Sequence, residues 1–169
     1  VVKARYYETD KMKIVHHSNY FRYFEVARCD FFAKKIISYS LLEEKYKILS
    51  PLLQASAKFF KPLRFEDVFS IVSFINDFSL IKLSFEYLVF FGSIEGDNLL
   101  NKIISYFDSG LKGMQDLVCW GQTVHTFVDA NKFFPIKPKV FIEERTANLD
   151  DIIKGLVIRA AVAQLDQSM

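Results

Sequence analysis

The segment 20–37 constrains the fold most strongly, because it contains no glycine or proline and repeats apolar side chains at helical spacing. Polar residues are scattered along it rather than gathered on one side. A helix that is apolar around most of its circumference is typical of a protein interior, so we expect the chain to fold around this helix. One face carries Tyr20, Phe24, Ala27 and Phe31, and another carries Phe21, Phe32 and Ile36.

The period of the pattern changes after the helix. Apolar side chains alternate with polar ones over residues 81–91, which predicts a strand with one buried face. Asn76 and Asp77 indicate the turn before it. Pro62 predicts a bulge or an edge in the preceding strand. The strands expected along the chain cover residues 3–8, 57–65, 68–75, 81–91 and 123–129.

This order of elements predicts an α+β fold, with the long helix on one face of an antiparallel sheet. A second short helix is expected over 41–46, capped by Ser38 or by Ser40 with Glu43 in capping-box spacing. A single domain then covers residues 1–138. It contains an atypical insert at about 92–118, with a helix expected over 99–107, and is followed by a C-terminal extension over 139–169, helical or disordered.

Composition narrows the classes of function. The 169 residues are 51% hydrophobic and carry a net charge of only +2, so we expect no nucleic-acid partner. No apolar run approaches the 18 residues of a membrane span. Cys29 and Cys119 lie far apart without framework spacing, which favours a reducing, cytoplasmic location.

The polar loop 9–18, just before the long helix, is the most informative place for chemistry. It holds Asp10, His16 and His17, with Ser18 or Asn19 as the expected cap. A helix start offers unpaired N–H groups that stabilise a developing oxyanion. A carboxylate there can act as a nucleophile or as a general base for water. Acyl transfer or thioester hydrolysis is therefore compatible with this loop but not required by it.

Each of these residues also has a structural interpretation. Asp10 can be a turn former, and the histidine pair can be solvated or hydrogen-bonded. Glu25 can be a buried polar anchor, an exposed charge or a site residue. Two adjacent histidines without cysteine or carboxylate at ligand spacing do not predict a zinc site, so no metal is expected. His125, on a strand, is expected to be structural.

The order of motifs in the opening segment resembles the 4-hydroxybenzoyl-CoA thioesterase family, in the acyl-CoA thioesterase branch of the hotdog fold. That family shows R-Y-x-E-T-D, then a loop ending in H-x-N-Y, then F-E-x-A-R along the central helix. The resemblance covers roughly residues 1–91 and 119–138. The matching residues are Arg5, Tyr6, Glu8, Thr9 and Asp10, then His17, Asn19 and Tyr20, then Phe24, Glu25, Ala27 and Arg28.

The resemblance implies a hotdog fold, in which a curved antiparallel sheet wraps a long central helix. It implies homodimers joined through their sheets, or homotetramers, with the active site at the interface. Asp10 would attack the thioester or activate water, and His17 would lie near the thioester. Backbone N–H groups near Asn19 and Tyr20 would polarise its carbonyl. Tyr6, grouped with Asp10 and His17 as a catalytic residue, and Tyr20 would surround the acyl group. Asn19, Tyr20 and Glu25 would help to bind substrate, and Lys58, Lys61 and Arg64 would be available for the phosphates.

The implied activity is hydrolysis of a short-chain or aromatic acyl-CoA to the free acid and coenzyme A. No cofactor is implied, because coenzyme A is part of the substrate. An acyl group on acyl carrier protein is an alternative substrate, and a non-catalytic acyl-CoA- or lipid-binding module is an alternative function. A dehydratase is disfavoured, because HHSNY lacks the glycines and prolines of a dehydratase loop. The chain departs from the family at Lys13, where many relatives have glycine, and in the longer segment 92–118.

Overall fold

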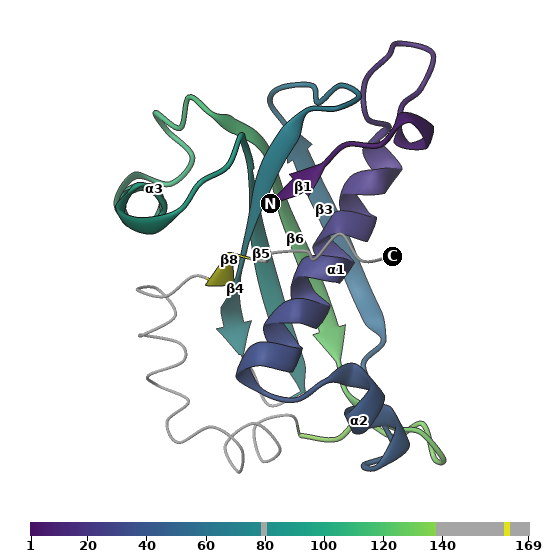
Figure 1. Cartoon of the computed structure of the whole chain (residues 1–169). Helices are drawn as coiled ribbons and strands as arrows, with labels where there is room; N and C mark the ends of the chain where they lie inside the picture. Colours follow the sequence, from purple (N-terminus) through teal and green to yellow (C-terminus); the bar gives the residue numbers. More distant parts are fainter. Residues whose placement is uncertain (79–80, 138–160, 163–169) are drawn as a thin grey trace.

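A long helix lies along one face of an antiparallel sheet (Figure 1). The computed structural model describes residues 1–78, 81–137 and 161–162. The elements are β1 (Val2–Lys3), η1 (Tyr6–Glu8), α1 (His17–Lys35), α2 (Tyr39–Glu44), β2 (Ile48–Leu49), β3 (Leu52–Phe59), β4 (Val68–Phe78), β5 (Lys82–Phe91), α3 (Gly96–Ser109), β6 (Leu117–Thr126), β7 (Val128–Asp129) and β8 (Ala161–Val162).

The main sheet has the strand order β1-β4-β5-β6-β3, and β8 also pairs with β4. All of these pairs are antiparallel. β3 pairs with β6 from Leu52 opposite His125 to Phe59 opposite Cys119, and no other strand of the described part pairs with it. β2 and β7 form a separate two-stranded sheet, and β2 precedes β3 in the chain. β3 is therefore an open edge of the main sheet.

The main core lies between α1 and the sheet. The rings of Phe24 and Tyr87 stack with centroids 4.5 Å apart. A Cβ at Gly121, on β6, would overlap the Phe24 ring, so glycine at this position allows the helix to approach the strand closely. The predicted apolar face of α1, namely Tyr20, Phe24, Ala27 and Phe31, is fully buried, which confirms the central helix.

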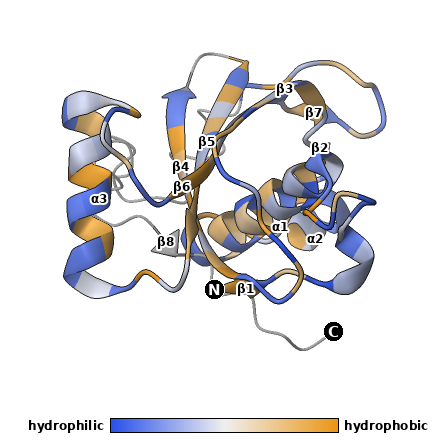
Figure 2. Ribbon diagram, turned by 90° about the horizontal axis from the view of Figure 1, so that it is seen from above, coloured by the Kyte–Doolittle hydropathy of each residue, from blue (hydrophilic) through white to orange (hydrophobic). Residues whose placement is uncertain are grey.

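The opposite face of the sheet is covered by α3 (Figure 2). Val72, Leu88 and Phe90 point to this side and pack with Ile103 of the helix in a second core. Every residue from Leu83 to Phe90 is consequently buried. The prediction that this strand has one buried face was wrong from Leu83 onward, because Ser84 and Glu86, two of the polar residues that suggested a solvated side, are buried, whereas Lys82 is exposed.

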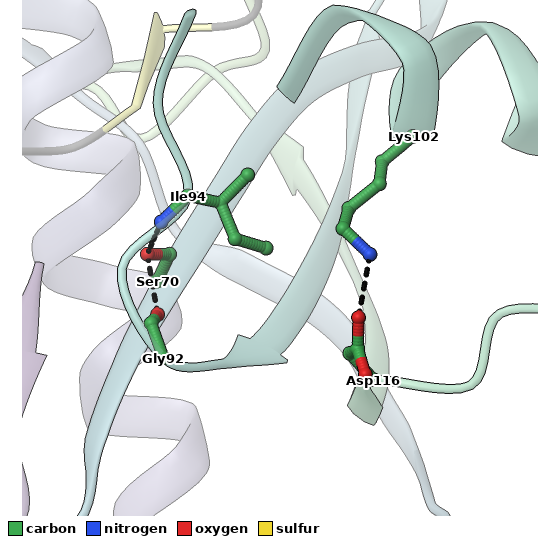
Figure 3. A network of polar contacts seen from close by, with 5 residues as sticks. All are labelled: Ser70, Gly92, Ile94, Lys102 and Asp116. Atoms are coloured by element: carbon green, nitrogen blue, oxygen red, sulfur yellow. Dashed lines mark hydrogen bonds and ion pairs between the residues drawn. The ribbon is translucent and has the colours of Figure 1, made fainter. Parts of the chain in front are cut away.

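The connection from β5 through α3 to β6 is fixed to the sheet by polar contacts (Figure 3). Ser70 Oγ donates to the Gly92 carbonyl at 2.8 Å and accepts from the Ile94 N–H at 3.0 Å. Lys102 Nζ donates to Asp116 Oδ2 at 2.8 Å. The helix expected over 99–107 is confirmed and extends beyond both expected ends.

Several predicted boundaries are wrong. The first expected strand is only β1, because its second half turns into the 3₁₀-helix η1. Asn76 and Asp77 lie within β4 rather than in a turn. The strand expected over 57–65 is β3, which ends at Phe59, before Pro62. Ser38 caps α2 through a hydrogen bond to the Leu41 N–H, as one alternative expected. The expected C-terminal extension lies outside the described residues except for β8.

Candidate active site

The loop that joins η1 to α1 is closed at its base by backbone hydrogen bonds. The His16 N–H donates to the Glu8 carbonyl at 2.9 Å, and Thr9 bridges to Val15. Further in, the Asp10 N–H donates to the Ile14 carbonyl at 3.0 Å. These bonds hold Asp10 and the first residues of α1 on one short, closed loop, as the sequence predicted.

Asp10 forms the tight turn at the tip of this loop. Its Oδ1 accepts from the Met12 N–H at 2.7 Å, and its carbonyl accepts from the Lys13 N–H at 2.9 Å. The side chain is half-buried. Lys13 has φ +61°, in the left-handed region that favours glycine. The glycine that the resemblance leads one to expect at this point would fit the turn without strain.

The helix begins earlier than the sequence suggested. His16, not Ser18 or Asn19, is the N-cap, and its Nδ1 accepts from the Ser18 N–H at 3.4 Å. The Asn19 N–H already donates to the His16 carbonyl at 3.0 Å. The predicted use of N–H groups near Asn19 and Tyr20 must therefore shift toward His17, the first helical residue. The His17 ring is exposed and lies 4.0 Å, centroid to centroid, from the His16 ring.

A buried carboxylate that sequence reasoning did not single out fixes the loop to α1. Glu8 Oε2 accepts from the Arg5 N–H at 2.7 Å and from the Tyr23 hydroxyl at 2.7 Å. The Glu8 carbonyl also accepts from Asn19 Nδ2 at 2.8 Å. Burial, with the hydrogen bond to Glu8, raises the pKa of the Tyr23 hydroxyl, so it remains a donor. Asn19, predicted to bind substrate, is buried and holds the loop through this contact.

Tyr20 joins the helix start to the open edge of the sheet. It is buried, and its ring meets the ring of Phe59, the last residue of β3, edge to face with centroids 5.0 Å apart. Burial raises the pKa of the Tyr20 hydroxyl, so it stays protonated at neutral pH. The Asp10 loop thus lies beside the Phe59 end of β3.

A pocket of about 620 Å³ opens between the N-terminal segment and α1. Arg5, Tyr6 and Tyr7 line one side of it, and Arg22 and Val26 of α1 line another. Tyr6 is the only one of the predicted site residues in its lining, and Tyr20, the acyl-pocket partner predicted for it, does not line this pocket.

The remaining predicted binding residues are exposed. Glu25 lies on α1, about two turns beyond His17. Lys58, Lys61 and Arg64 lie on β3 and in the connection that follows it. The backbone N–H of Arg64 donates to Asp67 Oδ2 at 2.6 Å. Their roles toward substrate stay predictions.

His125, which the sequence predicts to be structural, is deeply buried. His125 is 1% exposed, and burial followed by the Arg28 charge lowers its pKa to about 4. Within the described ranges, no group of three or more histidine, cysteine, aspartate or glutamate side chains could hold a metal ion. Among these same residues there is also no helix long and apolar enough to cross a membrane.

The arrangement can support acyl chemistry at one point. A half-buried carboxylate lies on a loop that leads directly into the N-terminus of a 19-residue helix, with an exposed histidine as the first helical residue. The N–H groups and partial positive charge of such a terminus favour an oxyanion.

Comparisons with known proteins identify the family. Residues 4–143 match the family model described as the Thioesterase-like superfamily. The chain is 41% identical over 88 residues to a "Putative esterase" of Aquifex aeolicus (strain VF5), covering 52% of this chain and 68% of that protein. It is 32% identical over 89 residues to the "Putative acyl-CoA thioesterase YneP" of Bacillus subtilis (strain 168), covering 53% of this chain and 64% of that protein.

Solved structures share the fold. The DHNA-CoA thioesterase of Staphylococcus aureus superposes with a TM-score of 0.66 at 25% identity, covering 85% of this chain and 81% of that one. The expected hotdog fold is thereby confirmed, with α1 as the central helix and α3 packed on the outer face of the sheet.

Proposed function

The chain belongs to the thioesterase-like superfamily, and we propose that this thioester hydrolase cleaves a short-chain or aromatic acyl-CoA into the free acid and coenzyme A. The observation that carries the proposal is the closed Asp10 loop at the start of α1. The backbone bonds of the loop and the Glu8 contacts hold the carboxylate in place before substrate arrives. Such preorganisation lowers the barrier of the chemical step.

In the proposed reaction, Asp10 acts as a general base. Its carboxylate takes a proton from water while the water oxygen attacks the thioester carbonyl carbon. The His17 N–H, at the helix start, faces the oxyanion that develops. The C–S bond then breaks, the thiolate of coenzyme A leaves and takes up a proton, and the acid is released. The His17 ring orients the thioester.

Asp10 can alternatively attack the carbonyl carbon itself. That step expels the coenzyme A thiolate and forms an acyl-aspartyl anhydride, which water then hydrolyses. Recovery of ¹⁸O in Asp10 after a single turnover in labelled water would establish this covalent route. Neither route needs a metal or a cofactor, because the coenzyme enters as part of the substrate.

The proposal assigns Tyr20 and Glu25 to the acyl side of the site and Asn19 to positioning the loop. We place Tyr6, which lines the pocket between the N-terminal segment and α1, on the entry side of the site. Lys61 and Arg64, beside the Phe59 end of β3, are available for the phosphates of coenzyme A. Free Cys29 and Cys119 are consistent with the cytoplasmic location that we propose.

The proposed active unit is a homodimer joined through β3. This strand has eight residues, and its outer edge is unpaired within the described structure. The large apolar side chains of Leu52, Leu53 and Phe59 are exposed on it. An exposed, apolar edge strand is a template for pairing with another strand. A second copy that pairs there would bring its own β3 beside the Asp10 loop.

The test is the release of free thiol from a panel of acyl-CoA thioesters, with Asp10→Asn beside the wild type. We expect the wild type to release thiol and the variant to lose at least about 100-fold in kcat/KM. The variant should remain folded, because a loop carboxylate contributes little packing.

Asp67→Asn is a matched control, since it removes another loop carboxylate whose contact is with the Arg64 backbone. Full activity of Asp10→Asn would reject the mechanism. An absence of thiol release from every acyl-CoA, with release from acyl carrier protein, would move the substrate class to carrier-bound acyl groups.

A further inference from the structure

Two phenylalanines are displayed at the tip of the turn that follows β7. Phe133 is 70% exposed and Phe134 is 71% exposed, whereas most phenylalanines of α1 and the central strands are fully buried. Leaving two adjacent large apolar side chains in water is unfavourable. Such a pair commonly marks a surface that contacts another molecule.

The turn is fixed in this shape by its own backbone. Asp129 Oδ1 accepts from the Asn131 and Lys132 N–H groups at 2.9 and 2.8 Å. The Phe133 N–H donates to the Asp129 carbonyl at 2.8 Å, and the Asp129 N–H donates to the Phe134 carbonyl at 3.0 Å. Phe133 has φ +55°, which is unusual for a bulky residue. The two rings are thus held outward by a closed network of hydrogen bonds.

The turn lies at the opposite end of β3 from the Asp10 loop. The Ile48 and Leu49 strand, β2, pairs with β7 directly before the turn, and Leu52 then begins β3 opposite His125. At the far end of the same strand, Phe59 contacts Tyr20 beside the Asp10 loop. β2 and β7 lie next to β3 on the side of the sheet that carries α1 and α2 (Figure 2).

Antiparallel pairing of two β3 strands brings these two ends together. In a twofold pair centred on the middle of the strand, Leu52 faces Phe59 of the partner subunit. The Phe133–Phe134 turn of one subunit then extends over the Asp10 loop of the other, on the same face of the joined sheet as the helices. Within one subunit the two features stay separated by the length of β3.

We infer that Phe133 and Phe134 form a wall of the acyl-binding site of the opposite subunit and set its preference for apolar acyl groups. The inference rests on the proposed function and on pairing through β3. Each active site then combines Asp10 of one subunit with the aromatic pair of the other.

The first experiment changes the turn alone. Phe133→Asn with Phe134→Ser removes both rings, and asparagine tolerates the positive φ. We expect kcat/KM for an aromatic or medium-chain acyl-CoA to fall about tenfold, and that for acetyl-CoA to change less than about twofold. The matched control is Phe91→Ser, a half-exposed phenylalanine at the end of β5, which should keep wild-type kcat/KM.

The second experiment tests whether the turn acts across the interface. Two chains with different affinity tags are co-expressed, and the mixed dimer is purified through both tags. One chain carries Asp10→Asn, and the other carries the double turn variant. In this dimer one site combines a native Asp10 with a native turn from the other chain, so about half of the wild-type activity should return.

A second mixed dimer pairs a wild-type chain with a chain that carries all three substitutions. Its one native Asp10 faces an altered turn, so activity should stay about tenfold below half of the wild type. If the first mixed dimer were the weakly active one and the second kept half of the wild-type activity, the turn would act in the site of its own subunit. That result would overturn the inference. Wild-type kcat/KM in the turn variant would also overturn it. Full activity of Asp10→Asn alone would instead count against the proposed function, so the two failures are read from different proteins.

Discussion

At the scale of single residues, the buried Glu8 carboxylate ties η1, which leads into the Asp10 loop, to α1. Its partners are the Arg5 N–H and the Tyr23 hydroxyl. Glu8→Ala leaves the buried Tyr23 hydroxyl and the partly buried Arg5 N–H without this acceptor, so we expect the free energy of unfolding to fall by about 1–3 kcal/mol. Thiol release should fall with it, because the loop loses its tie to α1.

Urea unfolding followed by circular dichroism measures the stability of this variant. The matched control is Glu66→Ala, whose carboxylate forms an exposed ion pair with Lys3. That variant should change stability by less than about 0.5 kcal/mol. Equal effects of the two substitutions would mean that the Glu8 contacts do not stabilise the loop.

His125 makes stability depend on pH. Its pKa is about 4 in the folded chain, because burial disfavours the imidazolium, against 6.5 ordinarily. Between these values the unfolded chain binds a proton that the folded chain does not. The contribution of His125 is therefore complete above about pH 6.5 and is lost as pH falls toward 4, by about 3 kcal/mol in total.

The free energy of unfolding between pH 4 and 7.5 checks this expectation. His125→Gln should have a smaller slope over that range than the wild type, because glutamine does not titrate. The remaining titratable groups are the same in both proteins, so the difference in slope gives the contribution of His125. Parallel curves would show that this imidazole is not held neutral by the fold.

The sequence motif grouped four residues of the candidate site, but it predicted neither the Glu8–Tyr23 contact nor the start of α1. Asp10, His17, Asn19 and Tyr20 lie in one continuous segment, so a motif could place them together. The contact between Glu8 and Tyr23 joins residues 15 apart across a turn, and neither helical nor strand periodicity pairs them. The earlier helix start depends on the backbone of His16, which composition does not reveal.

At the scale of elements, the approach of α1 to the sheet depends on Gly121. Gly121→Ala places a Cβ against the ring of Phe24, and we expect a loss of about 1–3 kcal/mol in the free energy of unfolding. Adding Phe24→Leu should recover part of that loss, because the smaller side chain frees the space. A double-mutant cycle by thermal unfolding measures the coupling, and strictly additive losses would contradict this packing.

α3 contributes stability without touching the Asp10 loop. Ile103 is 1% exposed, so Ile103→Ala should cost about 2–4 kcal/mol. Thiol release from the folded variant should stay at the wild-type level. Ile104→Ala is the control, since Ile104 is the next residue of α3 and is exposed. A loss of kcat/KM in Ile103→Ala at full folding would mean that the outer layer is coupled to the site.

Elements with a strong local pattern were predictable. The spacing of Phe24 and Phe31 predicted α1, and the alternation around Phe85 predicted β5. The second buried face of β5 was not predictable, because Glu86 and Ser84 are as polar as solvated residues. Glu86 is buried only because Tyr106 and Asn76 donate to its carboxylate beneath α3. A local sequence pattern cannot predict hydrogen bonds to a buried carboxylate from residues that are distant in sequence.

At the scale of the whole molecule, the open edge of β3 predicts the oligomeric state. We expect a dimer by light scattering after gel filtration. Ala55→Lys should shift it toward the monomer, because the middle of β3 would bring two cations close together at the twofold axis. Ile104→Lys, on the outer helix, should leave the dimer unchanged. A wild-type monomer that hydrolyses acyl-CoA would reject both the dimer and the shared site.

The outer helix also has an evolutionary consequence. By covering Leu88 and Phe90, α3 turns the outer side of the sheet into interior, so apolar substitutions there become favourable after the helix is present. A descendant that lost α3 would then expose those side chains to water and aggregate. The more apolar the residues beneath α3 are, the less viable a deletion of the helix becomes, so the helix can be retained for stability whether or not it serves catalysis.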